Sequence, residues 1–248
     1  MRKVCLMGIT EPEQSESGAP VIRHSASDAK SELVGGAAQF TELIESHIDK
    51  HFGKRRTVFH EIVSDLVHLD VEVIEPTSDR PYVTLVTNGM SDRPMNAPQG
   101  SEESRYAELV LSLPSDWPLT QEASADERNY WPIRWLKELA RLPHKYSTWL
   151  WASHTVPNGD PPQPYADNTK LCCALILIPI LVPQSFLHLR ATPAVTIHFL
   201  SFVPIYKEEM DLKLAKGLDP LLSLFEKARI SELLTVNRPN TCKRGFFR

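Results

Sequence analysis

The sequence predicts an α+β domain with a central mixed, largely antiparallel sheet of about six strands flanked by helices. Three observations lead to this prediction. Segments of alternating apolar and polar residues follow one another before residue 115, two continuous apolar segments lie after residue 170, and helical apolar spacing precedes, separates and follows these groups. Short links between the early strands favour antiparallel pairing.

Four helices are expected from helical apolar spacing or from start signals. In the first, Phe40, Ile44 and Ile48 share one face, and Gly53 suits the position just after a helix end. In the second, Pro132 is tolerated in the first turn. The four helices cover about residues 37–53, 130–146, 206–217 and 219–230.

Six strands are expected between these helices. Val71 and Val73 alternate with polar residues, which is the period of a half-buried strand. The last strand is apolar on both faces, as in a central strand packed by helices. The six strands cover residues 57–62, 67–76, 82–87, 106–114, 170–180 and 194–206.

The chain divides into three segments by composition. Residues 1–35 are polar and aperiodic, which predicts a poorly ordered N-terminal arm. Residues 36–235 form the predicted domain. Residues 236–248 form a basic C-terminal tail, which we expect to be solvated.

Composition narrows the classes of partner. A formal net charge of −4 over 248 residues argues against nucleic acid, because phosphate contacts need a basic excess. The most apolar run, residues 171–183, is too short to span a bilayer and contains Pro179, so no membrane partner is expected. The four cysteines lack metal-site or redox-motif spacing, which indicates reduced thiols in a cytoplasmic protein.

No motif in the sequence predicts a catalytic set, a metal site or a cofactor. The chain has only 10 glycines, and neither a phosphate-binding loop nor a nucleophile elbow occurs. One alternative is a hydrolase that uses Ser91 with a histidine such as His154. Another is a metal-dependent enzyme, since His47 and His51 have the spacing that stacks two imidazoles on one helix face. Two ligands alone do not complete a metal site.

The loop after the third expected strand supplies the candidate partner-binding residues. Gly89 permits a positive φ, and Ser91 or Asp92 would then satisfy the loop amides. Met90 and Met95 either fill gaps under the loop or, if the loop is exposed, provide an adaptable binding surface. The candidate set is Asn88, Gly89, Met90, Ser91, Asp92 and Met95.

The tryptophans permit two interpretations. All five fall within 35 residues of the sequence, which indicates a core built around one helix, a groove lined by some of them, or both together. They are Trp117, Trp131, Trp135, Trp149 and Trp151.

Five segments, taken in order, resemble the suppressor-of-fused domain family in its shorter bacterial form. They are YVTLVTNGMSDRPM, YAELVLSLPSDW, WPIRWLKELARLP, SHTVPNGDP and FVPIYKEEMDLKLAKGLDPLLSLF, and the resemblance covers about residues 38–230. It implies a mixed α/β domain that binds proteins. Animal relatives sequester a transcription factor in Hedgehog signalling, partly by accepting a peptide strand, and bacterial relatives are proposed to neutralise polymorphic toxins as immunity proteins.

The resemblance also limits what can be transferred to this chain. The second, C-terminal domain of the animal proteins is expected to be missing, which argues against the Hedgehog role. Only the strand-loop positions Gly89, Met90 and Ser91 match the family signature, and the resemblance implies a structural role for them at least as much as a functional one. We therefore expect a non-catalytic protein-binding module whose partner is another protein, possibly a cognate toxin. The alternatives are the hydrolase or metal enzyme above and a regulatory scaffold unrelated to toxins.

Overall fold

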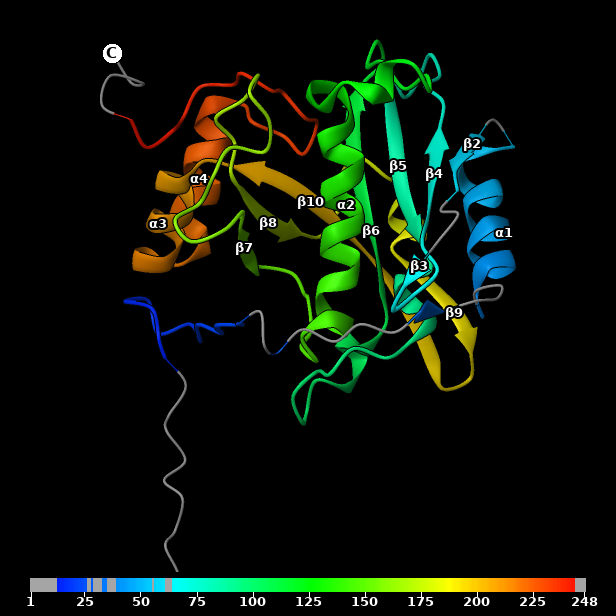
Figure 1. The fold of residues 1–248 in the computed structure, drawn as a ribbon, viewed down its shortest axis with the longest axis horizontal. Helices are drawn as coiled ribbons and strands as arrows, with labels where there is room; N and C mark the ends of the chain where they lie inside the picture. Colours follow the sequence, from blue (N-terminus) through cyan, green and yellow to red (C-terminus); the bar gives the residue numbers. More distant parts are fainter. Residues whose placement is uncertain are drawn as a thin grey trace, which may run out of the picture.

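The computed structural model describes residues 13–25, 28, 33–34, 39–54, 56–60 and 64–243. Over these residues the chain forms an α+β domain in which helices pack on a mixed sheet (Figure 1), which confirms the predicted fold class. The four expected helices are present as α1 (Thr41–Phe52), α2 (Glu127–Lys145), α3 (Lys207–Lys216) and α4 (Leu218–Ala228). Short 3-10 turns are η2 (Met90–Asp92), η3 (Glu102–Arg105), η4 (Ala123–Ala125) and η5 (Gln184–Phe186).

The strands are β1 (Leu33–Val34), β2 (Arg56–Phe59), β3 (Ser64–Asp65), β4 (Asp70–Ile74), β5 (Tyr82–Asn88), β6 (Ala107–Pro114), β7 (Thr155–Pro157), β8 (Cys173–Leu177), β9 (His188–Thr192) and β10 (Val195–Ile205). Within the described residues, the central sheet has eight strands in the order β2–β4–β5–β6–β10–β8–β7, with β9 also paired to β10. β10 runs parallel to β6, and the other neighbouring strands of this described sheet are antiparallel. β1 and β3 form a separate antiparallel pair.

The sheet is larger than the six strands expected from the sequence. The six correspond to β2, β4, β5, β6, β8 and β10, and the described sheet adds β7 and β9. β7 has three residues within a Pro- and Gly-rich stretch, and β9 has five residues, of which three are partly buried. β7 is too short to show apolar alternation, and the alternation in β9 is limited to Leu189 and Ala191, so pairing with longer neighbours determines their conformation.

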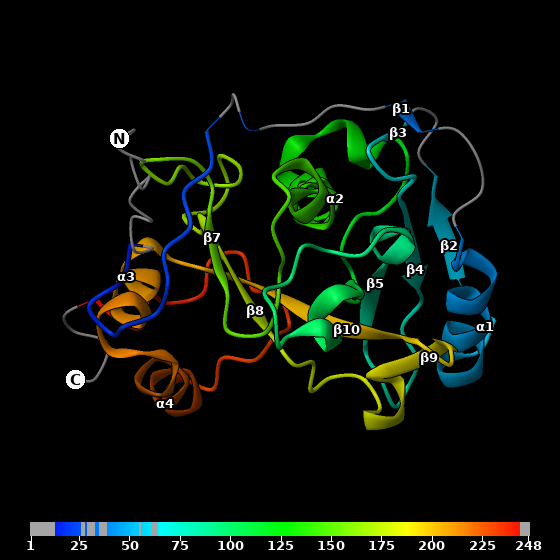
Figure 2. The ribbon, with the colours of Figure 1, turned by 90° about the horizontal axis from the view of Figure 1, so that it is seen from below.

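Alternation along the strands divides the core between the two faces of the sheet. Leu109 and Leu111 of β6 belong to the cluster that packs under α2, whereas Val110 belongs to the cluster that packs under α1. Figure 2 shows α2 on one side of the strands and α4 on the other. We call the two clusters the α2 core and the α1 core.

α2 begins earlier than expected and contains two interior prolines. The Asp126 side chain caps the helix by accepting a hydrogen bond from the Arg128 backbone N–H at 3.0 Å. Pro132 therefore lies beyond the first turn, where its missing N–H would leave the Arg128 carbonyl without a helical donor. The Asn168 side-chain amide donates to that carbonyl at 3.1 Å. A side chain from a distant loop thus replaces the lost helical bond.

A third cluster lies where α3 and α4 pack on β8 and β10. Cys172 and Cys173 are buried in it as free thiols with their sulfur atoms 3.8 Å apart, while Cys5 lies outside the described residues. Part of the predicted C-terminal tail also belongs to the fold. Arg238 is buried and donates two hydrogen bonds to the Glu209 carboxylate, at 2.7 and 2.5 Å.

The predicted segment boundaries stay predictions, and most of residues 1–35 lies outside the described residues. The described part of the arm contacts the domain at two points. The backbone N–H of Ser17 donates to the Leu214 carbonyl of α3 at 3.0 Å, and the His24 ring stacks on Tyr146 with centroids 4.7 Å apart. Among the described helices, none combines the length and apolar character that a bilayer crossing needs.

Candidate partner-binding site

The turn after β5 holds all six residues predicted to bind a partner. β5 ends at Asn88, Gly89 reverses the chain with φ of 128°, and η2 follows. At the far end of the turn, the Met95 backbone N–H donates to the Arg105 carbonyl at 2.7 Å. The turn is therefore fixed at both ends by backbone geometry.

The buried carboxylate of Glu108 on β6 accepts the hydrogen bonds of this turn. Backbone N–H groups of Gly89, Met90 and Ser91 donate to it at 3.1, 3.3 and 2.9 Å. The hydroxyl groups of Ser91 and Thr87 donate to it at 2.7 and 2.5 Å. Loss of water on burial outweighs these donors and raises the pKa of Glu108 to about 7.

Gly89 is required by space as well as by backbone conformation. Its positive φ confirms the sequence expectation, and a Cβ atom at this position would lie 1.9 Å from the His68 carbonyl oxygen. The expectation that Ser91 or Asp92 satisfies the loop amides is wrong, because Glu108 does so. Asp92 instead accepts a weak hydrogen bond of 3.4 Å from the Phe40 backbone N–H.

Most of the six candidate side chains are buried. Met90 and Met95 are members of the α2 core, and Ser91 is fully buried against Glu108. The Asn88 amide, also buried, donates to Glu72 at 3.2 Å, and Asp92 is partly exposed. Their burial indicates that they hold the turn in place. Direct contact between these six residues and a partner stays a prediction.

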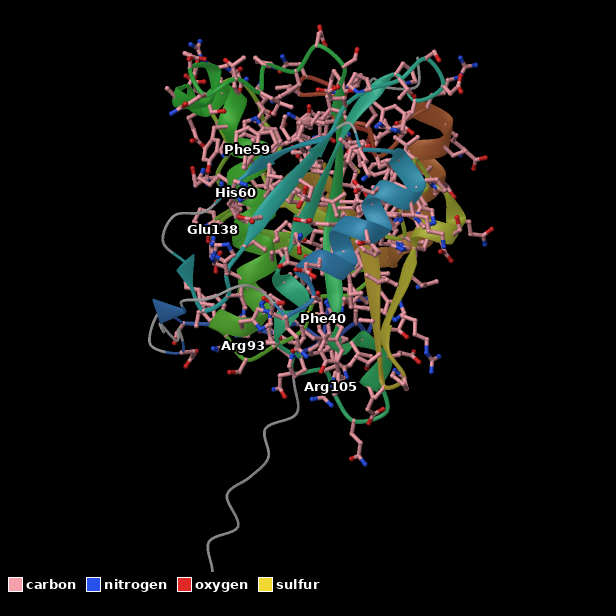
Figure 3. The ribbon with its side chains drawn as sticks, turned by 90° about the vertical axis from the view of Figure 1, so that its right-hand side faces the viewer. Phe40, Phe59, His60, Arg93, Arg105 and Glu138 are labelled. Carbon is pink, nitrogen blue, oxygen red and sulfur yellow. The ribbon has the colours of Figure 1, made fainter. Side chains whose placement is uncertain are left out.

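The accessible surface beside this turn is a cleft of about 420 Å³. It separates the chain after η2 from the C-terminal end of α2, and Figure 3 shows Arg93 at the same end of the molecule as Phe40. His144 closes one wall by donating from Nε2 to the Met90 carbonyl at 2.9 Å, and burial lowers its pKa, which keeps the ring neutral at pH 7. The lining residues are Leu66, Arg93, Pro94, Asn96, Pro143, His144 and Ser147.

The geometry does not support Ser91 as a nucleophile. A catalytic serine needs a base within hydrogen-bond distance and an exposed hydroxyl that substrate can reach. The Ser91 hydroxyl has no exposure and donates to a carboxylate that four other groups also bind. Ser91 therefore acts as part of the Glu108 site.

The histidines considered for a metal site or for a hydrolase make structural contacts. His47 Nε2 donates to the Phe186 carbonyl at 3.0 Å, and His51 Nδ1 donates to the His47 carbonyl at 2.8 Å. His154 Nδ1 accepts from the Trp151 backbone N–H at 3.3 Å. Within the part of the chain that the structure describes, no three His, Cys, Asp or Glu side chains are placed to hold a metal ion.

The tryptophans pack in or against the α2 core. Trp131 is fully buried and stacks on Tyr165 with ring centroids 5.0 Å apart. The other four are partly buried and contact the same cluster. This arrangement favours the core interpretation over a groove lined by tryptophan.

The two ends of the sheet differ as surfaces for another chain. β7 is three residues long and ends in Pro157, which has no N–H to offer. β2 is four residues long, contains no proline and pairs only with β4 among the described residues. Figure 3 shows Phe59 and the adjacent His60, where β2 ends. β2 is therefore the better template for an added strand.

Glu108 is the site residue that sequence analysis missed. It is the one charged residue in β6, where every residue but the last is buried, and a buried carboxylate needs donors close by. That local pattern could have identified Glu108. Its partners, which come from a different strand and turn, could not be read from spacing.

Comparison with known proteins agrees with this fold. The family described as Suppressor of fused protein (SUFU) matches residues 65–239, which is more than half of the chain. The sequence matches none of the curated proteins with which it was compared. In a search of solved structures, a suppressor-of-fused homologue from Neisseria gonorrhoeae aligns with a TM-score of 0.59 at 19% identity, over 84% of this chain and 100% of that one.

Two further structures align at lower identity and support the fold alone. The crystal structure of a Sufu–Fu complex gives a TM-score of 0.58 at 12% identity, over 83% of this chain and 93% of that one. Drosophila Suppressor of Fused gives 0.50 at 13% identity, over 80% of this chain and 50% of the Drosophila chain. The extent of the family match and the agreement in fold assign this chain to the suppressor-of-fused family.

Proposed function

We propose that this chain is a non-catalytic protein-binding module that accepts an extended segment of its partner along the outer edge of β2. The observation that supports this most is the unpaired outer edge of β2 within the described residues. Main-chain N–H and C=O groups on such an edge bind an extended chain as an additional strand. The solved relative that was crystallised as a Sufu–Fu complex is consistent with protein binding.

The side chains of β2 fit a surface that is buried on only one face. Thr57 is exposed, while Val58 and Phe59 are half-buried, and Phe59 packs against the α2 core. A partner strand would therefore extend a formed core on one face and meet solvent on the other. In this arrangement, main-chain bonds supply affinity, and the alternating side chains of the partner supply specificity.

The proposal is tested by capture and then by a pair of proline variants. The wild-type chain is immobilised, exposed to lysate of the source organism, and the retained protein is identified by mass spectrometry and purified. Thr57→Pro and Val58→Pro are compared because the N–H groups of neighbouring strand residues point in opposite directions. Hydrogen exchange shows which of the two faces β4. The variant that lacks the outward N–H should lose binding while its unfolding free energy changes least, and equal affinity in both would refute the use of this edge.

The non-catalytic part of the proposal has its own test. Hydrolase substrates and divalent metals are assayed with the wild type and with Ser91→Ala, His47→Ala and His154→Ala. We expect no turnover from any of the four proteins. Turnover by the wild type that one substitution abolishes without unfolding the chain would overturn this part.

We further propose that the partner is a toxin, which the chain neutralises in the cytoplasm by covering its active segment. The resemblance to bacterial immunity proteins supports the toxin, and the buried free thiols of Cys172 and Cys173 support a reducing compartment. Occlusion requires one molecule of this chain for each toxin. Protection of cells that express the captured partner should therefore saturate at equal amounts of the two proteins, and protection at a small fraction of that amount would refute occlusion.

A further inference from the structure

The segment between β8 and η5 exposes apolar side chains to an unusual degree. Ile180 is 75% exposed and Ile178 is 48% exposed, which places both among the few large exposed hydrophobic residues of the described chain. Residues 176–187 contain no charged side chain, although 23% of the chain is charged. We call residues 177–183 the apolar loop.

The backbone of the apolar loop is held rigidly. The buried carboxylate of Glu232 accepts hydrogen bonds from the backbone N–H of Ile180, at 3.0 Å, and from that of Leu181. The Tyr82 hydroxyl of β5 donates to the Leu181 carbonyl. Val182, the next residue, is buried in the α1 core. The two isoleucines are thus presented from a fixed backbone, and their exposure does not result from a frayed segment.

A cation stacked between aromatic rings lies beside the loop anchor. The Arg80 guanidinium lies 5.3 Å from the Phe52 ring centroid and 5.6 Å from that of Tyr82. It donates to the Tyr82 carbonyl at 2.8 Å and to the Thr84 hydroxyl at 3.0 Å. Among the described residues Arg80 takes part in no ion pair, and its hydrogen bonds go to neutral oxygen atoms.

We infer that the apolar loop and Arg80 form a preformed contact surface for an apolar pocket of the protein partner, with a carboxylate at the pocket rim to meet Arg80. This inference rests on the proposed protein-binding function. Tyrosine and arginine are enriched in binding hot spots, and an aliphatic side chain that enters a partner's pocket can serve as the central anchor of an interface. A rigid loop also reduces the ordering entropy lost on binding.

The charges on this surface favour a protein over a lipid surface. Membrane-binding segments combine apolar residues with clusters of Lys and Arg that attract anionic headgroups. Residues 176–187 contribute no cation, and the guanidinium of Arg80 is held by its stack and hydrogen bonds. A single fixed cation beside two isoleucines matches one acidic side chain at the edge of an apolar pocket.

The test uses the purified partner that the wild-type chain captures, with affinity measured by isothermal titration calorimetry. Ile180→Asp should raise Kd at least tenfold, because it places a charge in the apolar pocket. Leu43→Asp is the matched control, since Leu43 is a 43% exposed apolar residue on α1. It should change Kd less than threefold. Glu232→Ala, which keeps both isoleucines but frees the two loop amides, should raise Kd at least threefold.

The outcomes separate this inference from the function on which it rests. Capture of a partner whose Kd is unchanged by Ile180→Asp and Ile178→Asp overturns the apolar loop and leaves the proposed function standing. Failure to capture any protein overturns both. A wild-type dimer in analytical ultracentrifugation that Ile180→Asp dissociates would show that a second copy occupies the surface, and it would also overturn the inference. Circular dichroism confirms that each variant is folded.

Discussion

Gly89→Ala adds one carbon atom to the centre of the turn after β5. The new Cβ would lie 1.9 Å from the His68 carbonyl oxygen, and the atom in its way belongs to backbone that cannot rotate aside. Moving that backbone costs about 1–3 kcal/mol, as for other overpacked sites. Placing alanine at a φ of 128° costs about 1–3 kcal/mol more. We expect a total loss of about 4 kcal/mol of unfolding free energy.

Gly100→Ala is the control that separates the two contributions. Gly100 also has a positive φ, of 87°, but no atom lies within 4 Å of its added Cβ. Its loss should be about 1–2 kcal/mol, from backbone conformation alone. Urea unfolding followed by tryptophan fluorescence gives both values. If the two variants differ by less than about 0.5 kcal/mol, the close approach of Gly89 to His68 is not what selects glycine there.

Three further changes test the interior. As pH rises from 5 to 8, the unfolding free energy of the wild type should fall relative to that of Glu108→Gln by roughly 3 kcal/mol, because Glu108 keeps its proton up to a pKa of about 7 in the folded state and releases it near 4.5 in the unfolded chain. His154, whose lowered pKa has the opposite effect on stability, is present in both proteins, so its contribution cancels. A difference between the two proteins that does not change with pH would refute the raised pKa of Glu108. Arg238→Ala should lower the unfolding free energy by about 3–5 kcal/mol, because it leaves the buried Glu209 carboxylate without its cation. Lys207→Ala, which removes an exposed ion pair, is the control and should lower it by less than about 0.5 kcal/mol. Similar losses for the two variants in urea unfolding would contradict the burial of the Arg238–Glu209 pair. Trp131→Ala should cost about 3–5 kcal/mol as a cavity in the α2 core, and a loss below about 1 kcal/mol would argue for the groove interpretation.

The long elements could be predicted because one periodicity governs each of them. In β6, Leu109 and Leu111 face the α2 core while Val110 faces the α1 core, so alternation in the sequence reports burial on both sides. The start of α2 was less predictable. Pro132 suggests a first turn, but the Asp126 cap and the distant Asn168 donor move the start five residues earlier than that proline. Local propensity cannot include a donor supplied from residue 168.

The position of the candidate site along the chain could be predicted, but the contacts between its residues could not. The positive φ at residue 89 could be anticipated, because glycine permits this conformation in a turn and a side chain resists it. The burial of Met90, Ser91 and Met95 could not, since it depends on Glu108 lying under the turn from the neighbouring strand. Composition cannot distinguish a methionine that fills a core from one that faces a partner.

Several of the residues considered for catalysis or metal binding make hydrogen bonds within the fold. Ser91 is bound to Glu108, His47 to a backbone carbonyl, and the buried acid Glu232 to the amides of the apolar loop. Each group is held by hydrogen bonds that a catalytic cycle would have to break, and an unpaired buried group costs about 1–3 kcal/mol. The surfaces that we propose to meet another molecule are the outer edge of β2 and the two exposed isoleucines of the apolar loop. As proposed, both would act through shape and main-chain bonding, and Glu232 holds one of them, the apolar loop, in place.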